Sequence, residues 1–305
     1  MRGSYRSPEK QAATLIAKMT SLGSSRHGTL KPEGITSVGT LRSYQQSLTQ
    51  FAVWRKEQGA IDNLKKASPE QIREYLQHRA EKVCQKTLDR DRQALSAVFR
   101  VSLERKDFKA RQEIKPDALS VSSRAYTKAQ VEAIAARQTT HHGLATLIAH
   151  AAGLRAHELH TLRPAAERGP STHRDWSANL HAGRQGIPYT VEGKGGLVRT
   201  VLLPTELAKR LETYRLSAPK TVVDRGVRYQ SYYAIPGGKA WSDRFSRMSS
   251  IVLGWSTGAH GVRHSYAQDR IEELQSRGFN YEVAKGLVAQ EVGHFDANTT
   301  TAYLR

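Results

Sequence analysis

The most informative part of the sequence lies near its end. Residues 260–264 read His-Gly-Val-Arg-His, and residues 292–303 read Val-Gly-His-Phe-Asp-Ala-Asn-Thr-Thr-Thr-Ala-Tyr. Histidine donates or accepts protons near neutral pH, arginine keeps its charge, and a tyrosyl oxygen can act as a nucleophile. These residue types, gathered in one short part of the chain, indicate a reactive site for an anionic substrate.

Two earlier segments carry similar residue types. Residues 153–159 read Gly-Leu-Arg-Ala-His-Glu-Leu, and residues 192–196 read Glu-Gly-Lys-Gly-Gly. The second segment is flanked by β-rich runs, which predicts a hairpin over 187–203. It is not a phosphate-binding P-loop, because no glycine precedes Gly193 at the required spacing and Gly195 stands where Ser or Thr is needed.

In this order, the four segments resemble the tyrosine recombinase (phage integrase) family. The family pattern runs Gly-Leu-Arg-x-x-Glu-Leu, a Gly-Lys-Gly hairpin, His-x-Leu-Arg-His, and Leu-Gly-His followed by Thr-Thr and a Tyr nine residues beyond that His. Here Tyr303 stands nine residues beyond His294. The resemblance covers the second half closely and residues 36–107 loosely, where the helical pattern looks like the family's core-binding domain.

The chain departs from the family pattern at a few positions. Val262 and Val292 replace leucines, and residues 163–167 lack the usual Trp-x-Asp. The interval from Arg263 to His294 is longer than in compact members, which predicts an insertion near residues 270–285. None of these departures removes a reacting group.

The resemblance implies that the chain breaks and rejoins DNA through a phosphotyrosyl bond, and the residue chemistry suits that reaction. The expected catalytic residues are Arg155, Lys194, His260, Arg263, His294 and Tyr303. Tyr303 would be the nucleophile, the arginines would bind the non-bridging phosphate oxygens, and Lys194 would protonate the leaving 5′ oxygen.

Four further expectations complete this site. His260 and His294 would add hydrogen bonds at the phosphate, and either could accept the tyrosyl proton. Glu158 would hold a catalytic Arg or His in place, and His264 is expected to be structural. Each residue also has an ordinary interpretation taken alone, as a helix cap, a solvated turn or a packed core side chain.

No metal or cofactor is expected. His260 and His264 have the spacing of metal ligands on a helix, but the His-Glu-x-x-His pattern and an obvious third ligand are missing. The arginines would supply the positive charge that metal ions bring in other strand transferases. The single cysteine, Cys84, excludes a disulfide framework and Cys-rich zinc modules.

The charge of the chain points to nucleic acid. The 305 residues hold 47 Lys and Arg against 28 Asp and Glu, for a formal net charge of +19. Residues 1–115 hold 23 basic against 12 acidic side chains, and residues 116–305 hold 24 against 16. Because both parts are basic, the excess is not a detachable tail, and it favours a polyanion partner, most often nucleic acid. The alternatives are a solvated basic surface or a ribosomal or RNA-packaging role.

The predicted fold is mainly α with a small β-sheet or hairpin (α+β). Residues 1–115 are expected to form a helical core-binding-like bundle, residues 116–126 a linker, and residues 127–305 a catalytic domain. Ser68 and Thr127 begin helices with Gln three residues later, as in a capping box. Further helices are expected at 8–22, 40–58, 87–104, 144–154, 205–217, 242–253 and 259–277.

The predicted function is that of a site-specific recombinase or integrase acting through a 3′-phosphotyrosyl intermediate and a Holliday junction. A type IB topoisomerase-like strand transferase and a catalytically silent DNA-binding protein are the alternatives. The expected partner is double-stranded DNA at recombination core sites, in a bacterial cytoplasm. No apolar run approaches the length of a membrane span, and the first residues lack the apolar core of a secretory signal.

The expected assembly is a homotetramer on paired DNA sites and a monomer in free solution. Only Leu304 and Arg305 follow Tyr303, so the family's usual docking helix is in doubt and Tyr303 is expected to be loosely held without DNA. The apolar stripe in residues 8–22 is a candidate for contact between protomers. Its alternative is packing within its own domain.

Overall fold

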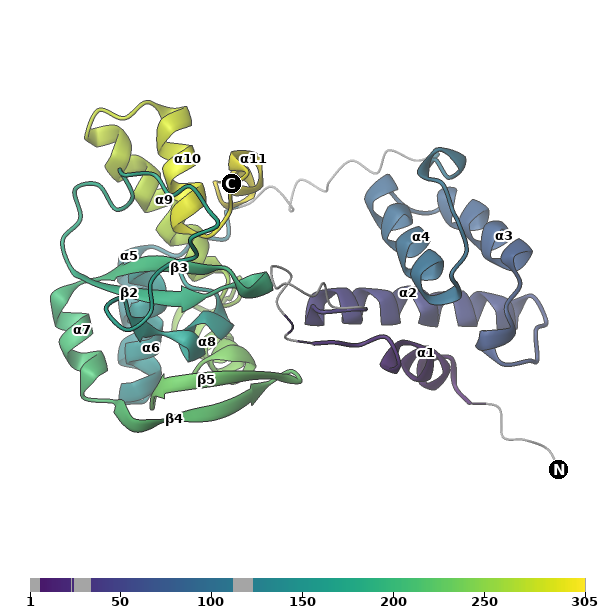
Figure 1. Cartoon of the computed structure of the whole chain (residues 1–305), viewed down its shortest axis with the longest axis horizontal. Helices are drawn as coiled ribbons and strands as arrows, with labels where there is room; N and C mark the ends of the chain where they lie inside the picture. Colours follow the sequence, from purple (N-terminus) through teal and green to yellow (C-terminus); the bar gives the residue numbers. More distant parts are fainter. Residues whose placement is uncertain (1–5, 23, 25–33, 112–122, 305) are drawn as a thin grey trace. The chain divides into compact units, whose positions relative to one another are not determined.

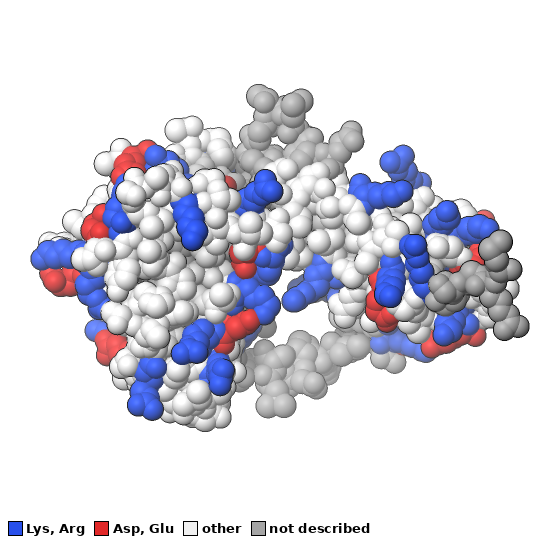
Figure 2. Space-filling view, turned by 90° about the horizontal axis from the view of Figure 1, so that it is seen from below, with Lys and Arg blue, Asp and Glu red and all other residues white. Residues whose placement is uncertain are grey.

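A computed structural model describes residues 6–22, 24, 34–111 and 123–304. The chain separates into two compact units, Met1–Asp117 and Ala118–Arg305. Lys and Arg side chains lie on both units in the face drawn in Figure 2, with Asp and Glu among them. No helix in the described ranges is long and apolar enough to cross a membrane.

The first unit is a helical bundle. Its helices are α1 (Pro8–Ala17), α2 (Val38–Glu57), α3 (Pro69–Ala80) and α4 (Gln85–Phe99), with short 3-10 turns at Leu64–Lys66 and Arg105–Asp107. The predicted capping box at Ser68 and Gln71 is confirmed at the start of α3. The core consists of buried apolar side chains, among them Ile16, Leu48, Phe51, Tyr75, Leu76 and Leu95.

The apolar stripe of α1 packs inside this unit. Ile16 is 2% exposed, and Leu15 and Met19 pack against the same core. The stripe is therefore used within its own bundle. The expectation that it contacts another protomer has no support in the structure, and the helix ends at Ala17 rather than continuing to Leu22.

The second unit combines helices with two small sheets (Figure 1). Its helices are α5 (Lys128–Ala136), α6 (Thr140–Ala151), α7 (Thr205–Glu212), α8 (Gly238–Leu253), α9 (Gly261–Ser276), α10 (Tyr281–Glu291) and α11 (Ala297–Thr300). The 3-10 segments η4 (Ala156–Thr161), η5 (Lys194–Gly196) and η6 (Thr301–Tyr303) carry site residues. The predicted α+β class is confirmed.

The three-stranded sheet has the order β1-β2-β3 and is antiparallel. Its strands are β1 (Arg163–Pro164), β2 (Ile187–Glu192) and β3 (Val198–Leu203). The predicted hairpin is confirmed, with Ile187 opposite Leu203 and Glu192 opposite Val198. Strand β3 alternates, so that Arg199, Val201 and Leu203 point into the unit.

The second sheet was not predicted. Strands β4 (Arg215–Asp224) and β5 (Val227–Tyr233) form an antiparallel ribbon where a helix was expected to run to residue 217. Most of β4 is exposed, so the alternation of apolar and polar residues that reveals a strand is weak. The turn between them is tight, and both Arg225 and Gly226 have positive φ. The glycine at position 226 is the one feature of this turn that the sequence shows.

The end of the predicted linker belongs to the second unit. Residues 116–122 lie outside the described part of the chain. Tyr126 is 2% exposed, stacks on Trp255 and donates its backbone N–H to Ser265 Oγ at 2.8 Å. The capping box predicted at Thr127 and Gln130 is confirmed directly after it.

Candidate active site

The fold brings most of the expected catalytic residues around one aromatic ring. Ring centroids of His260, His264 and His294 lie 5.4, 4.8 and 5.5 Å from that of Tyr303. Arg263 Cζ lies 5.5 Å from the same centroid. Arg155 joins the cluster through Nη2, which donates to His294 Nε2 at 2.9 Å.

Separate elements position these side chains. Arg155 precedes η4, and Arg263 and His264 lie in the first turn of α9, with His260 just before it. His294 follows the end of α10, and Tyr303 ends η6. The site therefore depends on the packing of α9 and α10 against the start of η4.

A buried carboxylate organises the arginines. Glu158 is fully buried; its Oε1 accepts from Arg155 Nη1 and its Oε2 from the Arg155 backbone N–H, both at 2.8 Å. Arg263 Nη1 lies 3.7 Å from Oε2. Burial alone would raise the pKa of Glu158, but the nearby guanidinium groups outweigh it and hold that pKa well below its usual range.

Arg199 completes this arrangement and was missed in the sequence. It is 1% exposed, and its Nη2 donates to Glu158 Oε2 at 2.8 Å. Its Nη1 donates to the backbone oxygen of Glu291 at 2.5 Å. The sequence did hold a signal for Arg199, because it lies on the same face of the predicted hairpin as Val201 and Leu203. A buried strand face rarely holds an unpaired arginine, so this position indicates a buried acidic partner.

Two glycines allow the arginines to approach the backbone. Gly153 has φ +57°, and a Cβ there would lie 2.6 Å from the Tyr266 ring. Its carbonyl accepts from Arg263 Nη1 at 2.6 Å. Gly293, before His294, has φ +71°, and a Cβ there would lie 3.1 Å from Arg199 Cδ. The Gly-Leu-Arg and Gly-His motifs thus need glycine for both conformation and space.

Arg263 is more enclosed than expected for a phosphate ligand. Its side chain is 0% exposed, its amino groups donate to Gly153 O and Val292 O, and Tyr303 lies over it. Burial and the neighbouring Arg155 lower the pKa of Arg263 to about 9, which leaves it charged at neutral pH. Its Nε has no partner among the described residues.

Tyr303 is itself packed. It is 7% exposed, and its carbonyl accepts from Gln268 Nε2 at 2.9 Å. The expectation of a loosely held Tyr303 does not match this arrangement. Because the ring covers the Arg263 guanidinium, a phosphate that contacts Arg263 requires the ring to shift.

The histidines of the cluster favour the neutral form. Burial first, and the charges of Arg263 and Arg155 next, lower the pKa of His294 to about 4. Burial and Arg124 likewise lower the pKa of His264 to about 4. The pKa of His260 is lowered as well, first by desolvation of its ring and then by the charge of Arg263. The residue as a whole is nevertheless more exposed than His264 and His294. Because Arg155 donates to Nε2 of neutral His294, the ring proton lies on Nδ1.

Lys194 lies at the edge of the cluster rather than inside it. It is exposed at the β2–β3 turn and makes no hydrogen bond or ion pair with a described residue. The preceding Gly193 faces the cluster: a Cβ there would lie 3.1 Å from Glu158 Oε1 and 3.5 Å from Arg155 Nη1. The hairpin thus brings Gly193, the residue before Lys194, close to Arg155 and leaves the Lys194 side chain exposed.

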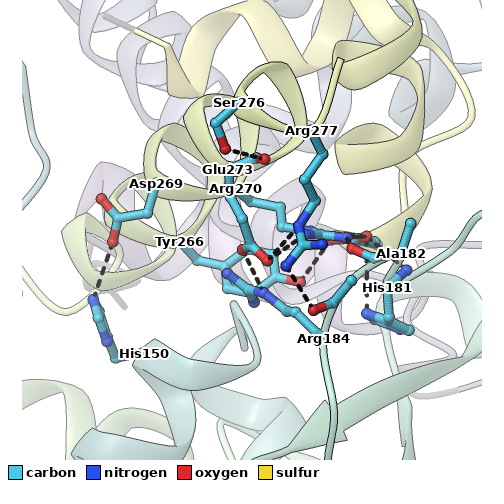
Figure 3. Close-up of polar contacts among 12 residues, drawn as sticks. His150, His181, Ala182, Arg184, Tyr266, Asp269, Arg270, Glu273, Ser276 and Arg277 are labelled. Carbon is cyan, nitrogen blue, oxygen red and sulfur yellow. Dashed lines mark hydrogen bonds and ion pairs between the residues drawn. The ribbon is translucent and has the colours of Figure 1, made fainter. Parts of the chain in front are cut away.

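A second buried carboxylate lies behind the cluster. Glu291 is 1% exposed and accepts from Arg270 Nε at 3.0 Å and from Tyr266 Oη at 2.7 Å. It also accepts from the His181 backbone N–H at 2.9 Å. This group links α9 and α10, and its partners His181, Tyr266 and Arg270 are labelled in Figure 3.

The first unit matches a family model. Residues 28–106 match the model described as "Phage integrase, N-terminal SAM-like domain". Together with the arrangement of the second unit, this match confirms the resemblance seen in the sequence. The chain has the fold of the tyrosine recombinases.

Solved structures with this tyrosine-recombinase fold align over nearly the whole chain. XerH site-specific recombinase bound to palindromic difH substrate, in a post-cleavage complex, aligns with 99% of this chain and 94% of its own at 16% identity, with a TM-score of 0.54. A lambda integrase dimer bound to a COC' core site aligns with 89% of this chain and 73% of its own at 15% identity, with a TM-score of 0.50. No curated protein matches the chain.

Proposed function

We propose that this protein is a DNA recombinase that cuts and rejoins strands through a covalent bond to Tyr303. The observation that carries the proposal is the cluster itself: a tyrosine surrounded by Arg263, His260 and His294, with Arg155 bonded to His294. Phosphodiester transesterification needs this set of a nucleophile, fixed cations and hydrogen-bond donors.

The charge balance supports a phosphate as the ligand. Arg155, Arg199 and Arg263 share one carboxylate, Glu158, so the group keeps an excess of positive charge. Arg155 is the accessible cation, with its side chain 20% exposed. A non-bridging oxygen bound at Arg155 lies beside His294, and charge that builds up on the phosphate in the transition state is stabilised there.

The protons are moved by the remaining side chains. A neutral His260 accepts the Tyr303 proton as the tyrosyl oxygen bonds to phosphorus. His294 takes this proton only if Arg155 first releases its Nε2, because its Nδ1 already carries a proton. The P–O bond to the 5′ oxygen breaks, and Lys194 at the hairpin turn gives that oxygen its proton. The phosphate is then joined to Tyr303 until a 5′ hydroxyl attacks and reverses the steps.

A trapping experiment tests this function and selects the target site at the same time. Nicked duplexes with a randomised centre lose the short strand after cleavage, so the phosphotyrosyl adduct accumulates and its DNA can be sequenced. We expect an adduct with the wild-type chain, none with Tyr303→Phe, and no effect of EDTA. Absence of an adduct from the wild-type chain would remove the proposal in favour of a silent DNA-binding protein.

The same adduct distinguishes recombinase from topoisomerase. If the chain is a recombinase, its products exchange strands only when two copies of the selected site are present, and light scattering finds a monomer without DNA and four copies on paired sites. Relaxation of a supercoiled plasmid that holds one site, without strand exchange between two, would favour the type IB topoisomerase alternative.

A further inference from the structure

Residues 165–186, between β1 and β2, form a long irregular segment that we call the strap. It contains no helix or strand, yet it is tied to several elements of the second unit. Ser171 and Val198 exchange two hydrogen bonds, with Ser171 N to Val198 O at 2.9 Å and Val198 N to Ser171 Oγ at 3.0 Å. Long irregular connections are uncommon in compact domains and are frequently functional when ordered.

The other end of the strap is held by α9 and α10. The backbone of His181 donates to Glu291 Oε1 at 2.9 Å, and Arg270 Nη2 donates to Ala182 O at 3.0 Å. Arg184 pairs with Glu273 at 2.7 Å. Figure 3 shows these strap residues facing the side chains of α9. The strap thus joins the Lys194 hairpin to the helices that position Arg263 and His294.

The middle of the strap places a cation and an aromatic ring against Phe295, the residue after His294. Trp176 Nε1 donates to Ser171 O at 2.9 Å, and its ring meets that of Phe295 edge to face at 5.0 Å. Arg174 Cζ lies 4.8 Å from the centroid of the same Phe295 ring. Phe295 directly follows His294 and is 38% exposed.

Arg174 has no acidic partner among the described residues. Its Nε is buried without a hydrogen-bond partner in the described part of the chain. Neither Asp175, the next residue, nor Asp296, the residue after Phe295, forms an ion pair with it. Asp296, which follows Phe295, instead caps α11 through Asn298 N at 2.9 Å. An aromatic ring holds this cation in place, and no carboxylate in the described ranges neutralises it. An anionic ligand can therefore bind to it as its partner.

We propose that Arg174, held by the Phe295 ring and the strap, binds the DNA phosphate backbone next to the phosphate cut by Tyr303. This proposal rests on the proposed function and adds a DNA-binding residue to it. A duplex carries a charge about every 1.7 Å along its axis. If one phosphate of the DNA binds at Arg155 and His294, neighbouring phosphates of the same duplex lie over the surface around Phe295. Arg174 lies there without an acidic partner among the residues that the structure describes. Arg174 anchors the backbone and takes no part in proton transfer.

The test compares salt dependence of DNA binding in a Tyr303→Phe background, so it does not depend on catalysis. The probe is duplex DNA that carries the site selected by trapping, or plain duplex if none is selected. Arg174→Gln should reduce the slope of log affinity against log salt by about 0.9 and weaken binding roughly fivefold at physiological salt. Arg174→Lys should restore the slope, because the charge returns.

Lys209→Gln is the matched control, since it removes the same charge from an exposed, acid-paired position on α7. We expect it to leave the slope unchanged. An unchanged slope and affinity in Arg174→Gln would overturn the proposal even if the wild-type chain forms adduct. A reduced slope with no adduct from the wild-type chain would instead refute the proposed function alone.

Discussion

The second unit contains two buried carboxylates that arginines surround, and the two differ in charge balance. Glu158 is shared by Arg155, Arg199 and Arg263. Glu291 has Arg270, whose other ion pair is with a second acid, Glu273. The first group carries an excess of positive charge, whereas the fully buried pair of Arg270 and Glu291 is balanced. Glu273 also pairs with Arg184 and Arg277, which are more exposed than Arg270.

We propose that this difference separates a binding site from a support. Buried cations are costly unless they are paired, so an excess of arginine persists where an anionic ligand is to be bound. A balanced ion pair needs no ligand and contributes by fixing the elements around it. Glu291 lies at the end of α10, and its own backbone oxygen holds Arg199, so the balanced group supports the unbalanced one.

The largest effect on stability is expected at the balanced group. Glu291→Gln leaves the Arg270 charge poorly paired in the interior and should lower the free energy of unfolding by about 3–5 kcal/mol. Glu206→Gln, which breaks an exposed pair with Lys209, should cost less than about 1 kcal/mol. Urea unfolding measures both. Similar small losses for the two variants would contradict the supporting role.

The largest effect on chemistry is expected at the unbalanced group. Arg155→Ala should slow adduct formation about 10²–10³-fold, because it removes a cation from the developing charge. DNA binding should stay nearly intact, since this arginine is one phosphate contact among many. Single-turnover rates and binding curves separate the two effects. If folded Glu291→Gln protein cleaved as slowly as Arg155→Ala, the division between site and support would fail.

A smaller effect is expected at the hairpin turn. Lys194→Ala should slow cleavage about 10²-fold, and a substrate with sulfur at the 5′ bridging position should recover much of the rate, because a thiolate leaves without a proton. Lys209→Ala serves as control and should change neither rate. No recovery with the sulfur substrate would assign the acid role to another residue.

The smallest effect is a pH dependence of stability. The pKa values of His264 and His294 are near 4 in the fold and near 6.5 in an unfolded chain. The unfolded chain binds more protons between these values, so stability is full above about pH 6.5 and falls as the pH drops toward 4. His294→Gln should make this slope shallower in urea unfolding between about pH 4.5 and about pH 7. An unchanged slope would contradict the low pKa of His294.

Local patterns predicted much of the fold. The capping boxes at Ser68 and Thr127 lie where expected, because a cap depends on residues within one turn. The Gly-rich turn predicted the β2–β3 hairpin for the same reason. The β4–β5 ribbon was missed, since its exposed residues lack the alternation on which strand prediction depends.

The order and spacing of motifs were readable along the chain, and they identified a candidate nucleophile, its cations and its proton carriers. The motif glycines Gly153 and Gly293 were seen in the sequence only as parts of motifs, and their positive φ is a finding of the structure. Sequence alone could therefore propose a chemistry for this site. The sequence could not show which side chains are hydrogen-bonded to one another or which arginines pair with the same carboxylate.

Those partnerships depend on tertiary packing. Arg199 meets Glu158 across 41 residues, and His181 meets Glu291 across 110. Arg174 rests on Phe295 only because the strap returns to α10. Ion pairing and burial depend on distance in space, while a sequence pattern records distance along the chain. The tertiary structure therefore decides which arginines are balanced and which are left for an anionic ligand.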